Sequence, residues 1–104
     1  MPRKSHSPCG ATGRAWTELP PELIARGLGK LIQDERLRWG MSQEALALRA
    51  GMDRSHYAKL ERGERSISLV HLFRIGEALG CSCAALVKRV ERDLSGRCLS
   101  RSLE

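Results

Sequence analysis

Four side chains that can bind an anionic or hydrogen-bonding ligand fall within six consecutive positions: Arg54, Ser55, His56 and Lys59. The two cations attract phosphate, and the hydroxyl and imidazole groups add hydrogen-bonding partners. If this segment is a helix whose Met52, Tyr57 and Leu60 face inward, helical geometry turns the four polar side chains outward, toward the helix N-terminus. Such a surface is suited to nucleic acid, provided that neighbouring elements hold the helix in place.

The sequence of residues 42–63 predicts two short helices joined by a tight turn, and this arrangement would hold the polar helix in place. Ser42 and Asp53 are suited to cap the two helix N-termini, because their side-chain oxygens accept from unpaired backbone N–H groups. Gly51 and Gly63 can adopt the left-handed conformation that ends each helix. This is the pattern of a helix-turn-helix, and it is the main reason to expect DNA binding.

The elements around this motif are also expected to be helical. A first helix is predicted over residues 22–39 and ends at Gly40. Two glycines, Gly27 and Gly29, leave open a later start at residue 28, because each weakens a helix by about 1 kcal/mol relative to alanine. Its apolar positions at helical spacing are Ile24, Leu28, Leu31 and Ile32.

Two more helices are predicted after the motif, capped by Ser68 and Ser82. Gly80 ends the first of them, and Ser95 with Gly96 ends the second. The inward stripes are expected to be Leu69, Leu72, Ile75, Ala78 and Leu79 in the first, and Leu86, Val87, Val90 and Leu94 in the second. The fold class is therefore a compact all-α domain of five helices.

Charge and composition divide the chain into a domain and two tails. The 104 residues carry a net charge of +6 and are 41% hydrophobic, which is enough for one small domain. Residues 18–87 contain ten basic and nine acidic side chains, so the positive excess lies in the terminal segments. We expect a disordered basic tail over 1–17 with Trp16 anchoring its end, a helix-turn-helix domain over 18–94, and a flexible tail over 95–104. Bulk charge is thus a weak argument for DNA binding.

Other classes of protein find little support. The four cysteines and the absence of an apolar leader favour free thiols in a reducing cytoplasm, and no run approaches the roughly 18 apolar residues of a membrane span. Cys81, Cys83 and His71 offer three metal ligands at poor spacing, so small, buried cysteines are the better interpretation. No nucleophile is paired with a base and no glycine-rich phosphate loop is present, so an enzyme, a cofactor and a small-molecule ligand are not expected.

Residues 28–87 resemble the Cro/C1-type helix-turn-helix family, the XRE-like or phage-repressor-like regulators. The matching positions are Leu28, Gly29, Ile32 and Arg36; Met41 to Glu44, Leu46, Ala47, Ala50 and Gly51; Leu60 to Gly63, Ser68, Leu69, Leu72, Ile75, Leu79, Gly80 and Leu86. Tyr57 departs from the family pattern, in which a smaller residue is commoner, and its buried hydroxyl then needs a partner.

The resemblance implies that the helix over residues 54–62 lies in the major groove of double-stranded DNA. Gln43 would contact the DNA backbone and support this helix, and Arg36 with Glu61 would join it to the first helix. A guanidinium that donates to O6 and N7 of guanine discriminates by about 1–3 kcal/mol, which makes Arg54 the strongest candidate for base recognition. The implied DNA-binding residues are Gln43, Arg54, Ser55, His56, Lys59 and Arg62, with Lys59 meeting phosphate or a base and Arg62 either DNA-binding or structural.

The expected function is a sequence-specific transcriptional regulator, acting as a homodimer on a palindromic operator. A controller of a restriction-modification operon and an antitoxin-like autoregulator are two concrete versions. The alternative is a protein-protein interaction module on the same fold, which the near-neutral domain permits. Val87, Val90, Leu94 and Leu99 supply either the dimer surface or packing for the domain core.

Overall fold

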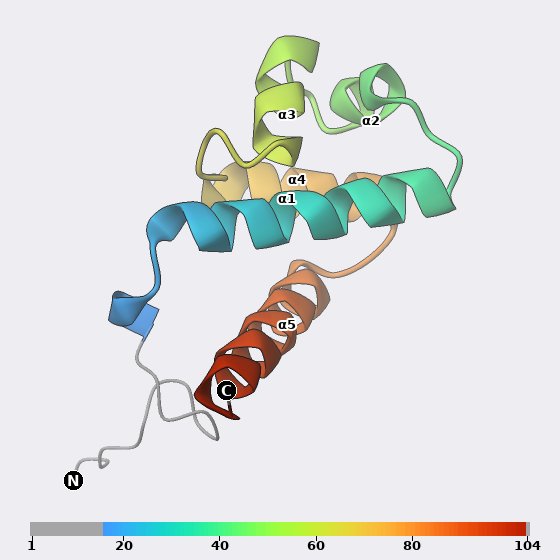
Figure 1. The fold of residues 1–104 in the computed structure, drawn as a ribbon. Helices are drawn as coiled ribbons and strands as arrows, with labels where there is room; N and C mark the ends of the chain where they lie inside the picture. Colours follow the sequence, from blue (N-terminus) through green and yellow to red (C-terminus); the bar gives the residue numbers. More distant parts are fainter. Residues whose placement is uncertain (1–15, 104) are drawn as a thin grey trace, which may run out of the picture.

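The computed structural model describes the backbone of residues 16–103 and the side chains of residues 16–95. Within this range a short 3-10 helix precedes five α-helices, which confirms the all-α fold class (Figure 1). The elements are η2 (Trp16–Glu18), α1 (Pro21–Arg38), α2 (Gln43–Arg49), α3 (Arg54–Glu61), α4 (Leu69–Leu79) and α5 (Cys83–Leu103). The predicted tail over 1–17 lies almost wholly outside the described residues.

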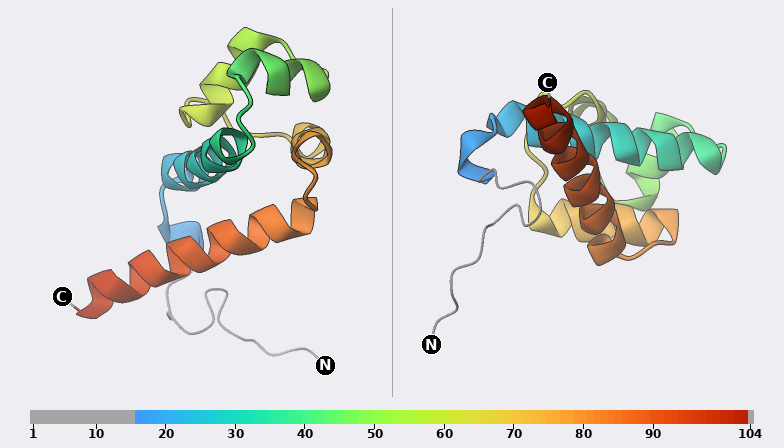
Figure 2. Two further views of the ribbon diagram at one scale, coloured as in Figure 1. Left: turned by 90° about the vertical axis from the view of Figure 1, so that its right-hand side faces the viewer. Right: turned by 60° about the horizontal axis from the view of Figure 1, so that its bottom comes forward.

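The helices close into a ring of contacts around one core. α1 packs on α3 and α5, α2 packs on α3 and α4, and α4 also packs on α5. Figure 2 shows α1 and α4 nearly end-on, with α2 and α3 on one side of them and α5 crossing the other. The core residues that fill this ring are Ile32, Leu46, Ala47, Ala50, Tyr57, Leu60, Ile75 and Leu79.

The predicted helix boundaries rest on the predicted capping groups. The cap oxygens accept backbone N–H groups at 3.0 to 3.3 Å: Ser42 from Ala45, Asp53 from His56, Ser68 from His71 and Ser82 from Ala85. Gly51 has a φ of 68°, a conformation that a side chain would strain, and so it turns the chain from α2 into α3. Gly63 and Gly80 end α3 and α4 in the same conformation.

Close packing of α1 on α3 explains a glycine that helix propensity alone disfavours. α1 runs unbroken from Pro21, so the alternative start at residue 28 is wrong. A Cβ atom on Gly29 would lie 2.5 Å from the carbonyl oxygens of both Leu60 and Glu61. Gly29 is therefore needed because the backbone of α3 occupies the space that a side chain would fill.

The burial of Leu69 in α4 and the end of α5 were predicted wrongly. Leu69 was expected in the buried stripe of α4, but it is 66% exposed. The first residue of α4 that packs against the core is Leu72, one turn further along the helix. The second helix does not stop at Ser95 and Gly96, since α5 continues to Leu103. A glycine inside a helix keeps its N–H group and costs only about 1 kcal/mol relative to alanine, so it does not by itself end the helix.

α5 carries the apolar residues that were expected either to form a dimer surface or to pack in the domain core. Leu86, Val90 and Leu94 are buried against the rest of the chain, which favours core packing over a dimer surface at Val90 and Leu94. Val87 is 44% exposed, so the prediction that it lies in the inward stripe is wrong. The side chain of Leu99 lies outside the described residues.

The remaining expectations concern the edges of the domain. Trp16 is half-buried and, with Ile24 and Val87, lines an apolar depression of about 250 Å³, as expected for an anchor. Cys81 and Cys83 are partly buried rather than fully enclosed. In residues 16–103 no single helix is long and apolar enough to cross a membrane; only α4 with the first part of α5 passes on length and composition, and these two meet at 104°.

Candidate nucleic-acid interface

The outward face of α3 gathers the predicted polar side chains. Arg54, Ser55 and Lys59 are exposed, whereas the buried face of the helix holds Tyr57 and Leu60. Arg54 makes no hydrogen bond or ion pair with any other residue of the described range, so its guanidinium is available to an external acceptor. Arg54, Ser55 and Lys59 lie together on this face, as the sequence predicts.

A shallow depression of about 220 Å³ lies along this face. It is lined by Asp53, Ser55, His56, Lys59 and Arg65. Arg65 was missed by the sequence reasoning, because residues 64–67 were treated only as a connection between helices. An arginine in the segment that follows a recognition helix is the signal that could have identified it, since the fold returns this segment to the side of α3.

His56 is held by a second histidine. The rings of His56 and His71 meet edge to face with centroids 4.9 Å apart. Nδ1 of His71 lies 3.0 Å from the Ser68 hydroxyl, the cap of α4. His56 is half-buried as a result, so less of its ring is available to a ligand than of the side chains of Arg54 and Lys59.

Gln43 supports α3 as the resemblance implies. Its amide Nε2 donates to Oε1 of Glu61 over 2.8 Å, which joins the first residue of α2 to the last residue of α3. The amide oxygen is not used in that bond. Gln43 thus fixes the spacing of the two helices and remains adjacent to the outward face.

Glu61 is the centre of a buried network that fixes α3 to α1 and α2. Arg36 donates from Nε and Nη2 to the two oxygens of Glu61 at 2.6 and 3.1 Å, and Nη1 reaches the Met41 carbonyl at 2.8 Å. The Tyr57 hydroxyl donates to Glu61 over 2.5 Å, which supplies the partner that its burial requires. The expected pairing of Arg36 with Glu61 is confirmed, and the shared role of Tyr57 was not foreseen.

The charges of this network are stabilised by hydrogen bonds. Burial opposes ionisation of Glu61, but its three donors and the charge of Arg36 outweigh burial and hold the pKa of the carboxyl below its ordinary value. Burial, with the bond to Glu61, raises the pKa of the Tyr57 hydroxyl, so this group remains a donor. The hydrogen bond to Glu61 raises the pKa of Arg36.

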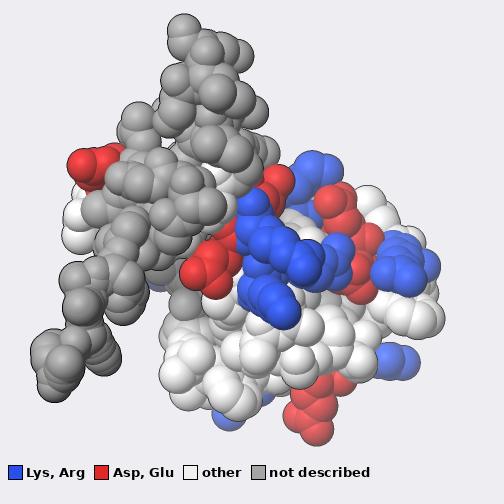
Figure 3. All heavy atoms as spheres, turned by 90° about the horizontal axis from the view of Figure 1, so that it is seen from below, with Lys and Arg blue, Asp and Glu red and all other residues white. Residues whose placement is uncertain are grey.

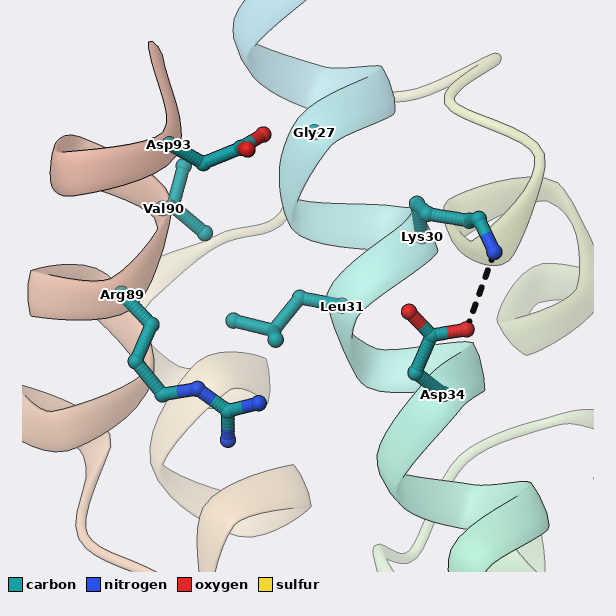
Figure 4. A pocket seen from close by; sticks show the side chains of 7 residues that line it. All are labelled: Gly27, Lys30, Leu31, Asp34, Arg89, Val90 and Asp93. Atoms are coloured by element: carbon teal, nitrogen blue, oxygen red, sulfur yellow. Dashed lines mark hydrogen bonds and ion pairs between the residues drawn. The ribbon is translucent and has the colours of Figure 1, made fainter. Parts of the chain in front are cut away.

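Arg62 and the crevice between α1 and α5 are less suited to bind an anion. Arg62 is exposed, but its guanidinium is paired with Glu64 at 2.8 Å. The crevice has a volume of about 390 Å³, and Figure 4 shows Lys30 paired with Asp34 on its wall. Arg89, on the opposite wall, is bonded to Glu35 at 2.8 Å. The outward face of α3 therefore offers the better anion-binding surface.

The match to a known family accords with this geometry. A family model described as helix-turn-helix matches residues 32–86, more than half of the chain. The chain belongs to the Cro/C1-type helix-turn-helix family. This family consists of DNA-binding transcriptional regulators and not of enzymes.

Curated relatives of this Cro/C1-type chain include regulators of known and unknown role. It is 33% identical over 64 residues to the control protein C.MunI of a Mycoplasma species, an alignment that covers 62% of this chain and 86% of the relative. It is 44% identical over 50 residues to an uncharacterised helix-turn-helix transcriptional regulator of Methanothermobacter thermautotrophicus, covering 48% of this chain and 72% of the relative.

The fold of this Cro/C1-type domain is similar to solved structures of restriction-modification controllers. The controller protein C.AhdI of Aeromonas hydrophila matches with a TM-score of 0.58 and 35% identity, over 60% of this chain and 94% of that one. A variant of the controller C.Esp1396I bound to its highest-affinity operator site matches with a TM-score of 0.62 and 26% identity, over 67% and 92%. The clp gene regulator ClgR of Corynebacterium glutamicum, at 24% identity and a TM-score of 0.71 over 81% and 89%, shows the fold.

Proposed function

We propose that this protein is a sequence-specific, operator-binding regulator of restriction-modification genes that acts as a homodimer. The observation that carries the proposal is the outward face of α3, which presents the unpaired guanidinium of Arg54 beside Ser55 and Lys59. The similarity of this chain to C.MunI and C.AhdI supports the proposal that the regulated genes are restriction-modification genes. One such domain reads only a few base pairs, so two copies related by a two-fold axis are needed for a specific site.

In this proposal α3 enters the major groove and its side chains divide the work. Arg54, Ser55 and His56, at the N-terminal end of the helix, face base edges. Lys59 contacts phosphate or a base farther along the groove. Gln43 contacts the DNA backbone, and Arg65 adds a phosphate contact from the connection after α3, while Arg62 stays paired with Glu64 and has a structural role. The positive tails supply non-specific attraction.

The decisive experiment is selection of bound sites from a random duplex library and from genomic fragments, at two salt concentrations. We expect a palindromic consensus upstream of restriction-modification genes and affinity that falls steeply with salt. A consensus without symmetry contradicts the dimeric site. Absence of binding at low salt contradicts DNA binding altogether and favours the interaction-module alternative.

Substitution of Arg54 is expected to change sequence preference. Arg54→Ala removes an exposed side chain that makes no hydrogen bond or ion pair within the described domain, so little effect on folding is expected. The variant is expected to lose about 1–3 kcal/mol of discrimination at one base position in each half-site. Site selection repeated with the variant measures the change, and an unaltered consensus contradicts the assignment of Arg54 to base recognition.

Lys59→Ala is the matched substitution on the same face. It is expected to weaken all sequences alike and to lower the slope of log affinity against log salt by about one. Titration of a consensus and a scrambled duplex at several salt concentrations distinguishes the two roles. Loss of preference at a single base would instead assign Lys59 to readout.

A further inference from the structure

Two of the three histidines of the chain are in contact at the edge of the candidate interface. His56 is on α3 and His71 is on α4, and their rings meet edge to face with centroids 4.9 Å apart. α3 packs mainly on α1 and α2, so the two rings add a direct link from α3 to α4. Both side chains are half-buried, and each keeps an exposed part. We call His56 and His71 the histidine pair.

The hydrogen bonds around His71 favour a neutral ring at this position. The Ser68 hydroxyl oxygen accepts the backbone N–H of His71 at 3.2 Å and lies 3.0 Å from Nδ1 of the same residue. Because the oxygen already accepts there, its own proton can point to Nδ1, and that bond requires an Nδ1 without a proton. Two protonated rings in contact would also repel each other. A single proton on the histidine pair is therefore assigned to His56.

His56 faces charged groups on the side of α3 that is turned outward. It lines the same depression as two cations and one anion, so a proton on His56 adds a further positive charge to an anion-binding surface. α1 and α2 pack on the other side of α3, where the charge of Arg36 is paired with that of Glu61. The charged and titratable groups that face His56 are Asp53, Lys59, Arg65 and His71.

The opposite side of the domain has no comparable feature within residues 16–95. Figure 3 views the molecule from the side of α5, and there Lys and Arg side chains lie next to Asp and Glu side chains. Between α1 and α5, Lys30 is paired with Asp34 and Arg89 with Glu35. Histidine is the side chain that ordinarily changes charge near neutral pH, and in this range it occurs only in the histidine pair.

DNA brings negative charge to this face in the proposed function. Phosphate near a histidine favours the protonated ring, because opposite charges stabilise each other. A protonated imidazole donates from both nitrogens, whereas the neutral ring has one donor and one acceptor. The major-groove edge of guanine presents two acceptors, N7 and O6. Binding of DNA and uptake of a proton by His56 therefore strengthen each other.

We propose that His56 takes up a proton when the protein binds DNA, and that His71 is the positioning residue that holds the His56 ring in place. The inference rests on the proposed function and adds that pH regulates the affinity for the operator. The gain in affinity is fully present at pH values where the free protein already carries the proton. It is lost as the pH rises past the point at which the complex releases that proton.

The test is titration of the selected consensus duplex with the full chain at about pH 8 and about pH 6, the range in which histidine changes charge, at constant salt. We expect affinity at the lower pH to be about fivefold higher for each copy bound, the factor that one favourable charge contact in water supplies. In His56→Gln the two affinities are expected to be nearly equal. Glu61 stays ionised over this range, because its pKa lies below the ordinary value, so the buried network holds α3 at both pH values.

Two control variants identify the group that takes up the proton. Lys59→Ala removes a cation from the same depression, and it is expected to weaken binding equally at both pH values. His6→Gln removes the histidine that lies outside the described residues, and it is expected to retain the wild-type pH dependence. Proton NMR of the ring C–H groups in the duplex complex is expected to show His56 protonated while His71 is neutral.

Substitution of His71 separates positioning from titration. His71→Phe keeps a ring against His56 but cannot take up a proton, and it is expected to retain the pH dependence. His71→Ala removes the ring that holds His56, so part of the gain at the lower pH is expected to be lost. Circular dichroism verifies that both variants are folded. Wild-type behaviour of His71→Ala overturns the positioning role, and loss of pH dependence in His71→Phe assigns the proton to His71 and overturns the inference.

The remaining outcomes separate this inference from the proposed function. Wild-type binding of equal affinity at both pH values overturns the inference, and so does a pH dependence that persists in His56→Gln. Binding of the operator in either case leaves the proposed function standing. Absence of duplex binding at both pH values contradicts the proposed function, together with the inference that depends on it.

Discussion

Replacing Glu61 with alanine is expected to destabilise the domain by about 3–5 kcal/mol, because one buried charge is removed and Arg36 is left unpaired. The side chains of Glu61 and Arg36 are only 2% and 9% exposed, so water cannot replace the lost partner. The Tyr57 hydroxyl loses its acceptor in the same step. Since small domains are stable by about 5–15 kcal/mol, the loss is a large part of the total. Urea unfolding followed by circular dichroism measures it.

Two control variants identify the cause of the effect. Glu64→Ala removes an exposed carboxylate from its pair with Arg62 and is expected to change stability little. Adding Arg36→Met to Glu61→Ala removes the uncompensated cation and is expected to recover part of the loss. Equal costs for Glu61→Ala and Glu64→Ala would show that the buried network does not hold α3 in place.

The same carboxyl predicts how stability depends on pH. Folding lowers the pKa of Glu61. The ionised carboxylate therefore contributes its full stabilisation at pH values above the ordinary pKa of glutamate. This stabilisation is lost as the pH falls through the lowered pKa. Glu35 acts in the same direction, because a hydrogen bond from Arg89 lowers its pKa. The acid-induced loss of stability is therefore expected to be smaller in Glu61→Gln than in the wild type.

Local rules sufficed to predict most of the helix boundaries. Ser42, Asp53 and Ser68 cap the helices where their side chains predicted, and Gly51 has the positive φ that the turn requires. These features depend on residues within one turn of each other, and so the sequence contains the information directly. The end of α5 was not predictable in this way, because Gly96 permits either outcome.

Features that depend on distant contacts could not be predicted from spacing. Helical periodicity places Leu69 and Leu72 on similar arcs, and only the positions of the neighbouring helices decide which one is covered. The acceptor of the Tyr57 hydroxyl, Glu61, could likewise not be predicted, because it depends on how α3 packs against Arg36 of α1. In the candidate interface, the face with Arg54 and Lys59 followed from periodicity, whereas Arg65 joins it only through the path of a loop.

Gly29→Ala is expected to destabilise the domain by about 3 kcal/mol and to weaken DNA binding as well. The new Cβ atom would lie 2.5 Å from two carbonyl oxygens of α3, and backbone atoms cannot rotate away as a side chain can. Relief requires α3 to move away from α1, which displaces the Arg54 face relative to Gln43. Denaturation and duplex titration measure the two effects.

Gly27→Ala is the matched control for this prediction, on the same helix two residues earlier. Its Cβ atom would meet side-chain atoms of Leu94 and Val90 at 3.6 and 3.8 Å, which are ordinary contact distances. This variant is expected to be more stable than the wild type by about 0.5–1 kcal/mol, because alanine is the better helix former. If both variants gain stability, α1 and α3 are not in the close contact that the Cβ distance at Gly29 indicates. Opposite signs at positions 27 and 29 would show that backbone contact with the recognition helix, and not helix propensity, is what requires glycine at 29.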